Sequence, residues 1–114
     1  MSTLSTHVLD TSLGRPARGV PVVLERRTAE RTWSESGRGK TDKDGRIRDL
    51  LAGRAGLKRG RYRLTFGVAA YFRAQRRPAF YAEVSIEFVV AKPNEHYHVP
   101  LLLSPWGYST YRGS

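Results

Sequence analysis

The sequence predicts an all-β sandwich with one short helix, and three observations lead to that fold class. Apolar residues recur at every second position in several segments, which is the period of a half-buried strand. Glycine, proline, asparagine and aspartate gather between these segments, as expected for tight turns. About eight short strands and one helical stretch are typical of two packed sheets in a small domain.

Six segments have the clearest strand pattern. Their expected ranges are residues 4–10, 20–27, 61–66, 83–88, 96–104 and 108–112. Alternation is most regular at Tyr62, Leu64 and Phe66, which are separated by polar residues. Residues 31–38 and 47–51 are weaker strand candidates, and the alanine-rich residues 68–75 are the expected helix.

Turn-forming residues separate these segments. The expected turns are residues 14–16, 42–45, 53–60, 92–94 and 105–107. Asp42 and Asp44 also match the start of a calcium-binding loop, but the acidic residue required at its twelfth position is replaced by Gly53. A tight hairpin turn is therefore predicted at residues 42–45.

Composition limits the classes of function open to this chain. Its 114 residues are close to the size of one domain, so residues 1–114 are expected to form a single domain. The lack of cysteine excludes disulfides, thiolate catalysis and zinc–thiolate sites, and it fits a reducing compartment. The N-terminus has no signal-peptide pattern, and no apolar run approaches the ~20 residues that span a bilayer. A cytoplasmic protein with no membrane partner is the expectation.

The formal net charge of +10 raises the question of nucleic-acid binding. However, the basic residues are scattered along the chain, mostly as single residues or short doublets, and no nucleic-acid-binding signature is present. The charge is therefore expected to form a solvated basic surface with a general attraction for small anions. No nucleic-acid partner is expected.

The three histidines, His7, His96 and His98, are the main candidates for chemistry. In the strand expected at residues 96–104, Tyr97 and the apolar residues that alternate with it form the better core face, so His96 and His98 are expected to point away from the core. A His-x-His pair and a distant third histidine could hold zinc, act as acid or base near neutral pH, or be structural. The pattern alone leaves these three roles open.

Two further features are candidate parts of a site. Arg46 follows the Asp44-Gly45 turn and begins a strand, where its guanidinium could clamp a carboxylate or a planar amide. The last residues, Tyr111-Arg112-Gly113-Ser114, follow an apolar strand and a Pro-Trp-Gly turn where most chains have a fraying polar tail. We expect this terminus to be anchored, which makes its free carboxylate a candidate site group.

Three sequence blocks together carry a resemblance to a known family. They are residues 4–10 (LSTHVLD), 41–46 (TDKDGR) and 96–114 (HYHVPLLLSPWGYSTYRGS), with shorter matches at residues 14–17, 60–62 and 71–72. The sequence closely resembles the 5-hydroxyisourate hydrolases, the transthyretin-like enzymes of urate breakdown. One departure is Ala82, because the family usually has proline after the Phe80-Tyr81 pair. We expect that change to affect the entry to a strand and not the site.

The resemblance implies a transthyretin-like β-sandwich of two four-stranded sheets with one short helix. It also implies a homotetramer built as a dimer of dimers, with the sites at the dimer–dimer interface, and it implies neither a metal nor a cofactor. The catalytic residues that it implies are His7, Arg46 and His98, and the substrate-binding residues are Tyr111, Arg112, Gly113 and Ser114.

The implied reaction is the hydrolysis of 5-hydroxyisourate, at a cyclic amide bond, to 2-oxo-4-hydroxy-4-carboxy-5-ureidoimidazoline. Because the chain has no cysteine and no evident activated serine, we expect direct attack by water. His7 or His98 would then be the base, and Arg46 would stabilise the developing negative charge. The alternatives are a transthyretin-like protein that binds a small ligand without turnover, and a zinc-dependent amidohydrolase that uses the same histidines.

Overall fold

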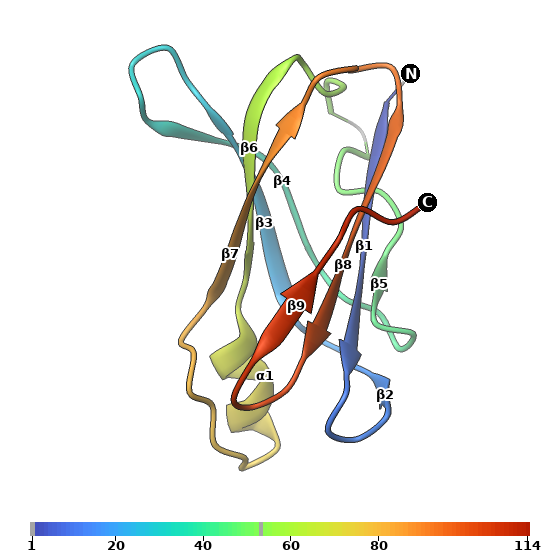
Figure 1. The fold of residues 1–114 in the computed structure, drawn as a ribbon, viewed down its shortest axis with the longest axis vertical. Helices are drawn as coiled ribbons and strands as arrows, with labels where there is room; N and C mark the ends of the chain where they lie inside the picture. The colour runs from blue at the N-terminus through green and yellow to red at the C-terminus, as the bar shows by residue number, and fades with distance from the viewer. Residues whose placement is uncertain (1, 53) are drawn as a thin grey trace.

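The computed structural model describes residues 2–52 and 54–114, and it shows two β-sheets packed face to face (Figure 1). The first sheet has the strand order β4 (Trp33–Lys40), β3 (Pro21–Arg27), β6 (Gly60–Phe66) and β7 (Val84–Val90). All neighbours in this sheet are antiparallel. The short helix α1 (Val68–Ala74) connects β6 to β7 at one end of the sandwich. The predicted all-β sandwich with one short helix is confirmed.

The second sheet carries the sequence blocks of the expected site. Its order is β2 (Arg15–Pro16), β1 (Thr3–Asp10), β8 (His96–Leu103) and β9 (Tyr108–Thr110), and β5 (Arg46–Ile47) also pairs with β1. Strands β1 and β8 are parallel and in continuous register from Thr3–His96 to Asp10–Leu103. This sheet therefore has five strands where four were predicted, because two short segments, β2 and β5, pair with β1 at different positions.

The core lies between the two sheets and follows the predicted alternation. Strand β1 alternates between half-buried and buried residues along its whole length, and β3 and β6 show the same pattern over most of theirs. Tyr62, Leu64 and Phe66 are at most 2% exposed, as their period of two predicted. On β8, Tyr97, Val99, Leu101 and Leu103 are buried inward. Burial of these apolar side chains supplies the main stabilisation of a fold of this size.

Several predicted boundaries were wrong. The strand expected at residues 47–51 is limited to β5, because the chain turns after it and the Leu50 amide donates to the Leu4 carbonyl (2.8 Å). Residues 15–16 form β2 instead of part of a turn, and β9 ends at Thr110 instead of Arg112. Gly53, the first residue of the turn predicted at 53–60, lies outside the described residues. The described part of the chain contains no helix that is long and apolar enough to cross a membrane.

Candidate active site

The outer face of the second sheet presents two histidines of β8 beside the start of β1. His98 is half-buried and its Nδ1 lies 2.7 Å from the Ser5 hydroxyl, which is its register partner across the parallel pair. His96 is exposed, its ring is stacked on that of His98 at a centroid distance of 6.4 Å, and it contacts the hydroxyls of Thr3 and Ser5. The predicted outward orientation of both histidines is confirmed.

His7 and Arg46 are direct neighbours on the same sheet, because His7 of β1 is the register partner of Arg46 in β5. The Asp42–Gly45 turn holds Arg46 in place: the Asp42 carboxylate accepts hydrogen bonds from the amides of Asp44 (2.8 Å) and Arg46 (3.0 Å). Gly45 has a φ of 74°, which favours glycine, and its carbonyl accepts a hydrogen bond from the Val8 amide (2.7 Å). The predicted hairpin turn thus places Arg46 beside His7.

Electrostatics favour the neutral form of both site histidines. Desolvation lowers the pKa of His7, and the charge of Arg46 lowers it further against the opposing effects of the nearby aspartates. Desolvation and then Arg46 also lower the pKa of His98, with smaller contributions from His96 and His7. Since an unperturbed histidine has a pKa of about 6.5, both side chains are largely unprotonated at neutral pH. An unprotonated imidazole can accept a proton from water.

Residues 111–114 do not all lie on the histidine face. Gly113 lies against His98, and its amide donates a hydrogen bond to the His98 carbonyl (2.8 Å). Tyr111 and Arg112 instead line a cavity of about 340 Å³ at the open edge between the sheets, together with inward-facing residues of β8 such as Tyr97. Ser114 is exposed at the end of the chain. The structure therefore brings Gly113 to the histidine face, and it places Tyr111 and Arg112 toward the sandwich edge.

Two residues that sequence reasoning missed hold the site residues in position. Ser5 contacts His98, and Glu95 forms an ion pair with Arg112 (3.1 Å), whose guanidinium lies 4.4 Å from the centroid of the Tyr97 ring. The sequence signal for Ser5 was its position two residues before His7, which puts both on one face of a strand. No comparable signal existed for Glu95.

Gly113→Ala is expected to displace His98 and so to lower the hydrolase activity that the resemblance implies. A Cβ at this position would lie 2.5 Å from His98 Cδ2 and 3.3 Å from its Cγ, so the ring must move. A shift of about 1 Å in a positioned catalytic group can cost about 10²-fold in rate. Gly107→Ala in the same segment is the matched control, since its Cβ would meet only the Ser104 hydroxyl at 4.0 Å. Equal kcat/KM values for the two variants would contradict the contact.

The three-histidine zinc alternative was tested on the described residues. Within residues 2–52 and 54–114, no group of three or more histidine, cysteine, aspartate or glutamate side chains is arranged to hold a metal ion. His96 and His98 instead contact hydroxyls of β1 through their ring nitrogens.

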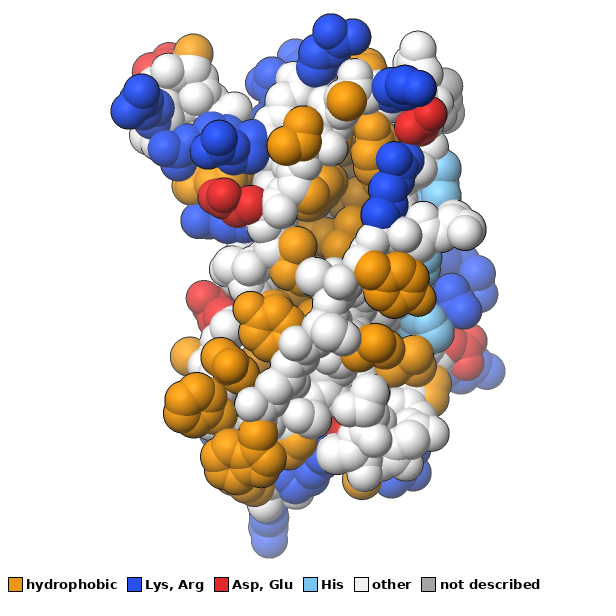
Figure 2. Space-filling view, viewed as in Figure 1, with side chains coloured by type: hydrophobic (Ala, Val, Ile, Leu, Met, Phe, Trp, Pro, Cys, Tyr) orange, Lys and Arg blue, Asp and Glu red, His pale blue; other side chains and the backbone are white. Residues whose placement is uncertain are grey.

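Figure 2 shows the histidine side chains along one edge of the molecule, with basic side chains next to them.

The sequence model of the HIUase/Transthyretin family matches residues 4–113 of this chain. The chain belongs to this family. Within it, the chain is 49% identical to the 5-hydroxyisourate hydrolase of Salmonella typhimurium, over 97% of this chain and 80% of that protein. The 5-hydroxyisourate hydrolase of Klebsiella pneumoniae has a solved structure with a TM-score of 0.87 and 42% identity, with all of both chains covered. The recognition of this family from the sequence is confirmed.

The same fold is found in the solved structure of a ligand complex. Sea bream transthyretin, solved in complex with thyroxine, has a TM-score of 0.90 and 30% identity, and the match covers 97% of this chain and 94% of that one. The fold is thus shared by hydrolases and by a thyroxine-binding protein. The side chains on the fold, and not the fold itself, must decide between the two activities.

Proposed function

We propose that this protein hydrolyses 5-hydroxyisourate to 2-oxo-4-hydroxy-4-carboxy-5-ureidoimidazoline. The observation that carries the proposal is the outward-facing group of His7, Arg46 and His98 on one sheet, in a chain 49% identical to a 5-hydroxyisourate hydrolase. Two largely neutral histidines near the Arg46 guanidinium provide a base for water and a positive charge for an oxyanion. Together they can promote the opening of a cyclic amide by direct attack of water.

In this mechanism His98 is the leading candidate for the general base. In the tautomer that carries its proton on Nδ1, His98 donates to the Ser5 hydroxyl, and Nε2 keeps a lone pair for the proton of the attacking water. The hydrogen bond also fixes the ring plane, and Gly113 packs against the ring. His7 lies beside Arg46 on the same outer face and is the alternative base in this mechanism.

Arg46 has two effects in the proposed mechanism. Its guanidinium can bind the electron-rich ring of the substrate and stabilise the negative charge that forms as the carbonyl becomes tetrahedral. Its charge also lowers the pKa of His7 and His98, which keeps them available as bases. Tyr111, Arg112, Gly113 and Ser114 complete the proposed substrate-binding set.

The proposal includes a homotetramer, a dimer of dimers, with the sites at the dimer–dimer interface. Self-association is supported by the open sandwich edge, where Val89 is 69% and Tyr111 is 58% exposed beside an apolar-lined cavity, whereas the location of the sites rests on the family resemblance. Exposed apolar surface of this kind is typical of a protein–protein contact, and a second copy is the occupant we propose. A cytoplasmic location belongs to the same proposal, since the cysteine-free sequence fits a reducing compartment.

The decisive test follows the ultraviolet absorbance of 5-hydroxyisourate generated in place by urate oxidase. We expect the native protein to accelerate its decay well above the spontaneous rate, and Arg46→Ala to lower kcat/KM by about 10²-fold or more because the oxyanion loses its charge partner. Arg18→Ala removes an exposed arginine from a loop and is the matched control. No acceleration by native tetramer would contradict the hydrolase proposal, and tight thyroxine binding without turnover would favour the transthyretin-like alternative.

A further inference from the structure

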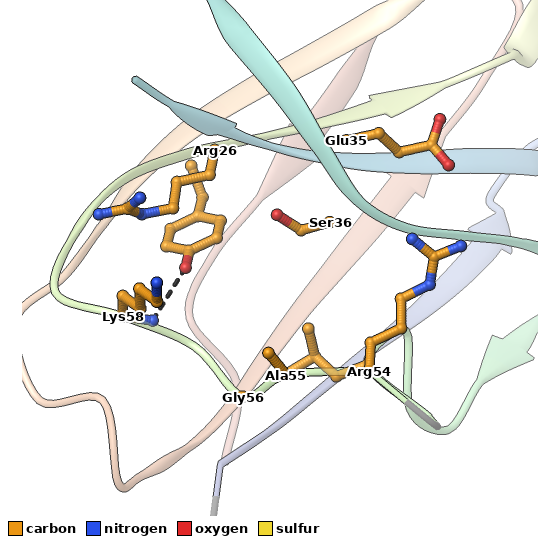
Figure 3. A pocket seen from close by; sticks show the side chains of 9 residues that line it. Arg26, Glu35, Ser36, Arg54, Ala55, Gly56 and Lys58 are labelled. Carbon is orange, nitrogen blue, oxygen red and sulfur yellow. Dashed lines mark hydrogen bonds between the residues drawn. The ribbon is translucent and has the colours of Figure 1, made fainter. Parts of the chain in front are cut away.

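A second pocket lies away from the histidine face, between strands β3 and β4 of the first sheet and the loop at residues 54–58. Its volume is about 320 Å³, within the range of small-molecule sites. Its lining includes Arg26, Glu35, Ser36, Arg54, Lys58 and Tyr62. None of these belongs to the histidine face, so the pocket is separate from the proposed active site (Figure 3).

Arg26 occupies an inward-facing position at the end of the core. On β3, Val22, Leu24 and Arg26 share one face, and the first two are at most 1% exposed. Arg26 is the register partner of the buried Tyr62, just as Leu24 is the partner of Leu64. The alternation along β3 predicts an apolar residue at this position, but the chain has a positively charged arginine there.

The Arg26 side chain also lacks a counterpart for its buried donor. Its Nε is buried, and in the part of the chain that the structure describes no group hydrogen-bonds to it. A buried donor without a partner destabilises the fold, and more so when the group is charged. Because Nε itself is covered, a ligand in the adjacent pocket would meet the outer nitrogens of the Arg26 guanidinium, which form no ion pair with a carboxylate of the described residues.

The charges around the pocket are mostly positive. Arg26, Arg54 and Lys58 line it against a single carboxylate, Glu35, which leaves three positive charges minus one negative, a net +2. Glu35 is bonded to Arg38 through both of its oxygens (2.5 and 2.9 Å), and its charge also acts on Arg54, which leaves Arg26 and Lys58 as the cations without a carboxylate partner in the pocket. Basic side chains also gather at the upper end of the molecule in Figure 2.

The loop that closes the pocket is held in place. The Lys58 amide donates to the Tyr62 hydroxyl (2.9 Å), and the Leu57 amide donates to the Ser2 hydroxyl (2.7 Å). Figure 3 shows Arg26 and Lys58 on one side of the opening, Arg54 on the other, and the Ser36 hydroxyl between them. Cations on two sides of a preformed opening match an acceptor with several oxygens.

We propose that this pocket binds a small oxyanion, a phosphate- or carboxylate-bearing molecule, which serves as the missing partner of Arg26. Guanidinium groups pair with such oxyanions through two parallel hydrogen bonds, and Lys58 adds a point charge. Leu51, Ala55 and the Tyr62 ring also line the pocket and can contact a compact apolar part of the ligand.

The test measures thermal unfolding and calorimetric binding with inorganic phosphate and with citrate, against sodium chloride of equal ionic strength. We expect saturable binding and a rise in the unfolding midpoint in the native protein. A stronger response to phosphate assigns the phosphate class, and a stronger response to citrate assigns the carboxylate class. Arg26→Met is expected to weaken binding about tenfold or more while remaining at least as stable as the native protein in sodium chloride, because an unpartnered buried donor is removed.

Arg18→Gln is the control, since it removes the same charge from an exposed loop position. It should keep the full response to both anions. Lys58→Gln, which leaves the core row intact, should also weaken binding and provides a second readout if Arg26→Met does not fold. Equal anion responses in all variants, or no saturable response in the native protein, would overturn the proposal.

Discussion

His98→Asn is expected to lower kcat/KM for 5-hydroxyisourate by about 10²–10⁴-fold, the usual contribution of a positioned general base. Asparagine is close to histidine in size and retains a polar group near the Ser5 hydroxyl, but it cannot accept a proton from water at neutral pH. The fold should tolerate the change because His98 lies on the outer face of β8 and is only half-buried. Circular dichroism and the absorbance assay together would check that activity and not folding is lost.

The pH–rate profile distinguishes the two candidate bases. Because the pKa values of His7 and His98 lie below the ordinary histidine value, activity should be full at neutral pH and fall on the acid side, below about pH 6.5. The acid limb should disappear from the residual activity of His98→Asn and persist in His7→Asn. The reverse pattern would assign the base to His7.

Much of this site could be predicted from the sequence because a period of two assigns faces directly. Alternation on β8 placed His96 and His98 opposite the buried Tyr97 and Val99, and the structure has them there. Turn chemistry likewise predicted the Asp42–Gly45 hairpin, since Asp42 caps it and Gly45 has a positive φ. Both signals are local, and local signals can be read without knowing the fold.

The contacts between distant segments could not be predicted in this way. Ser5 reaches His98 across 93 residues, and the pair exists only because β1 and β8 run parallel in one register. Arg46 meets His7 through a strand of two residues, too short to leave a periodic pattern. The period of two in β3 puts Arg26 on the face of Val22 and Leu24, but its pairing with the buried Tyr62 comes from the sheet and not from the sequence. Pairing is set by packing of the whole domain and not by local propensity.

The buried Asp10 is a further feature that its place in the sequence did not reveal. It is 0% exposed, and its Oδ2 accepts hydrogen bonds from the Tyr71 hydroxyl (2.8 Å) and the Arg77 guanidinium (2.9 Å). Its Oδ1 accepts from the amides of Ser12 (3.1 Å) and Leu13 (3.2 Å). One carboxylate thus connects the end of β1 to α1 and to the segment that follows the helix.

Asp10→Ala is expected to lower the free energy of unfolding by about 3–5 kcal/mol, because removal of one partner leaves buried donors and a charge uncompensated. Tyr71→Phe, which removes a single hydrogen bond, should cost only about 0.5–1.5 kcal/mol. Urea denaturation at one protein concentration would measure both changes. Similar losses in the two variants would mean that the carboxylate does not organise this end of the sandwich.

The acid stability of the protein should depend on the same carboxylate. Burial alone raises the pKa of Asp10, but hydrogen bonds from Arg77, Ser12 and Tyr71 outweigh it and lower the pKa to about 2. A carboxylate with a depressed pKa stabilises the fold fully above its unfolded value of about 3.9, and the effect is lost as pH falls through about 2. The native protein should therefore lose stability over that interval relative to Asp10→Asn, which has no carboxylate to titrate. Parallel acid-unfolding curves for the two proteins below pH 4 would show that the charge of Asp10 contributes nothing.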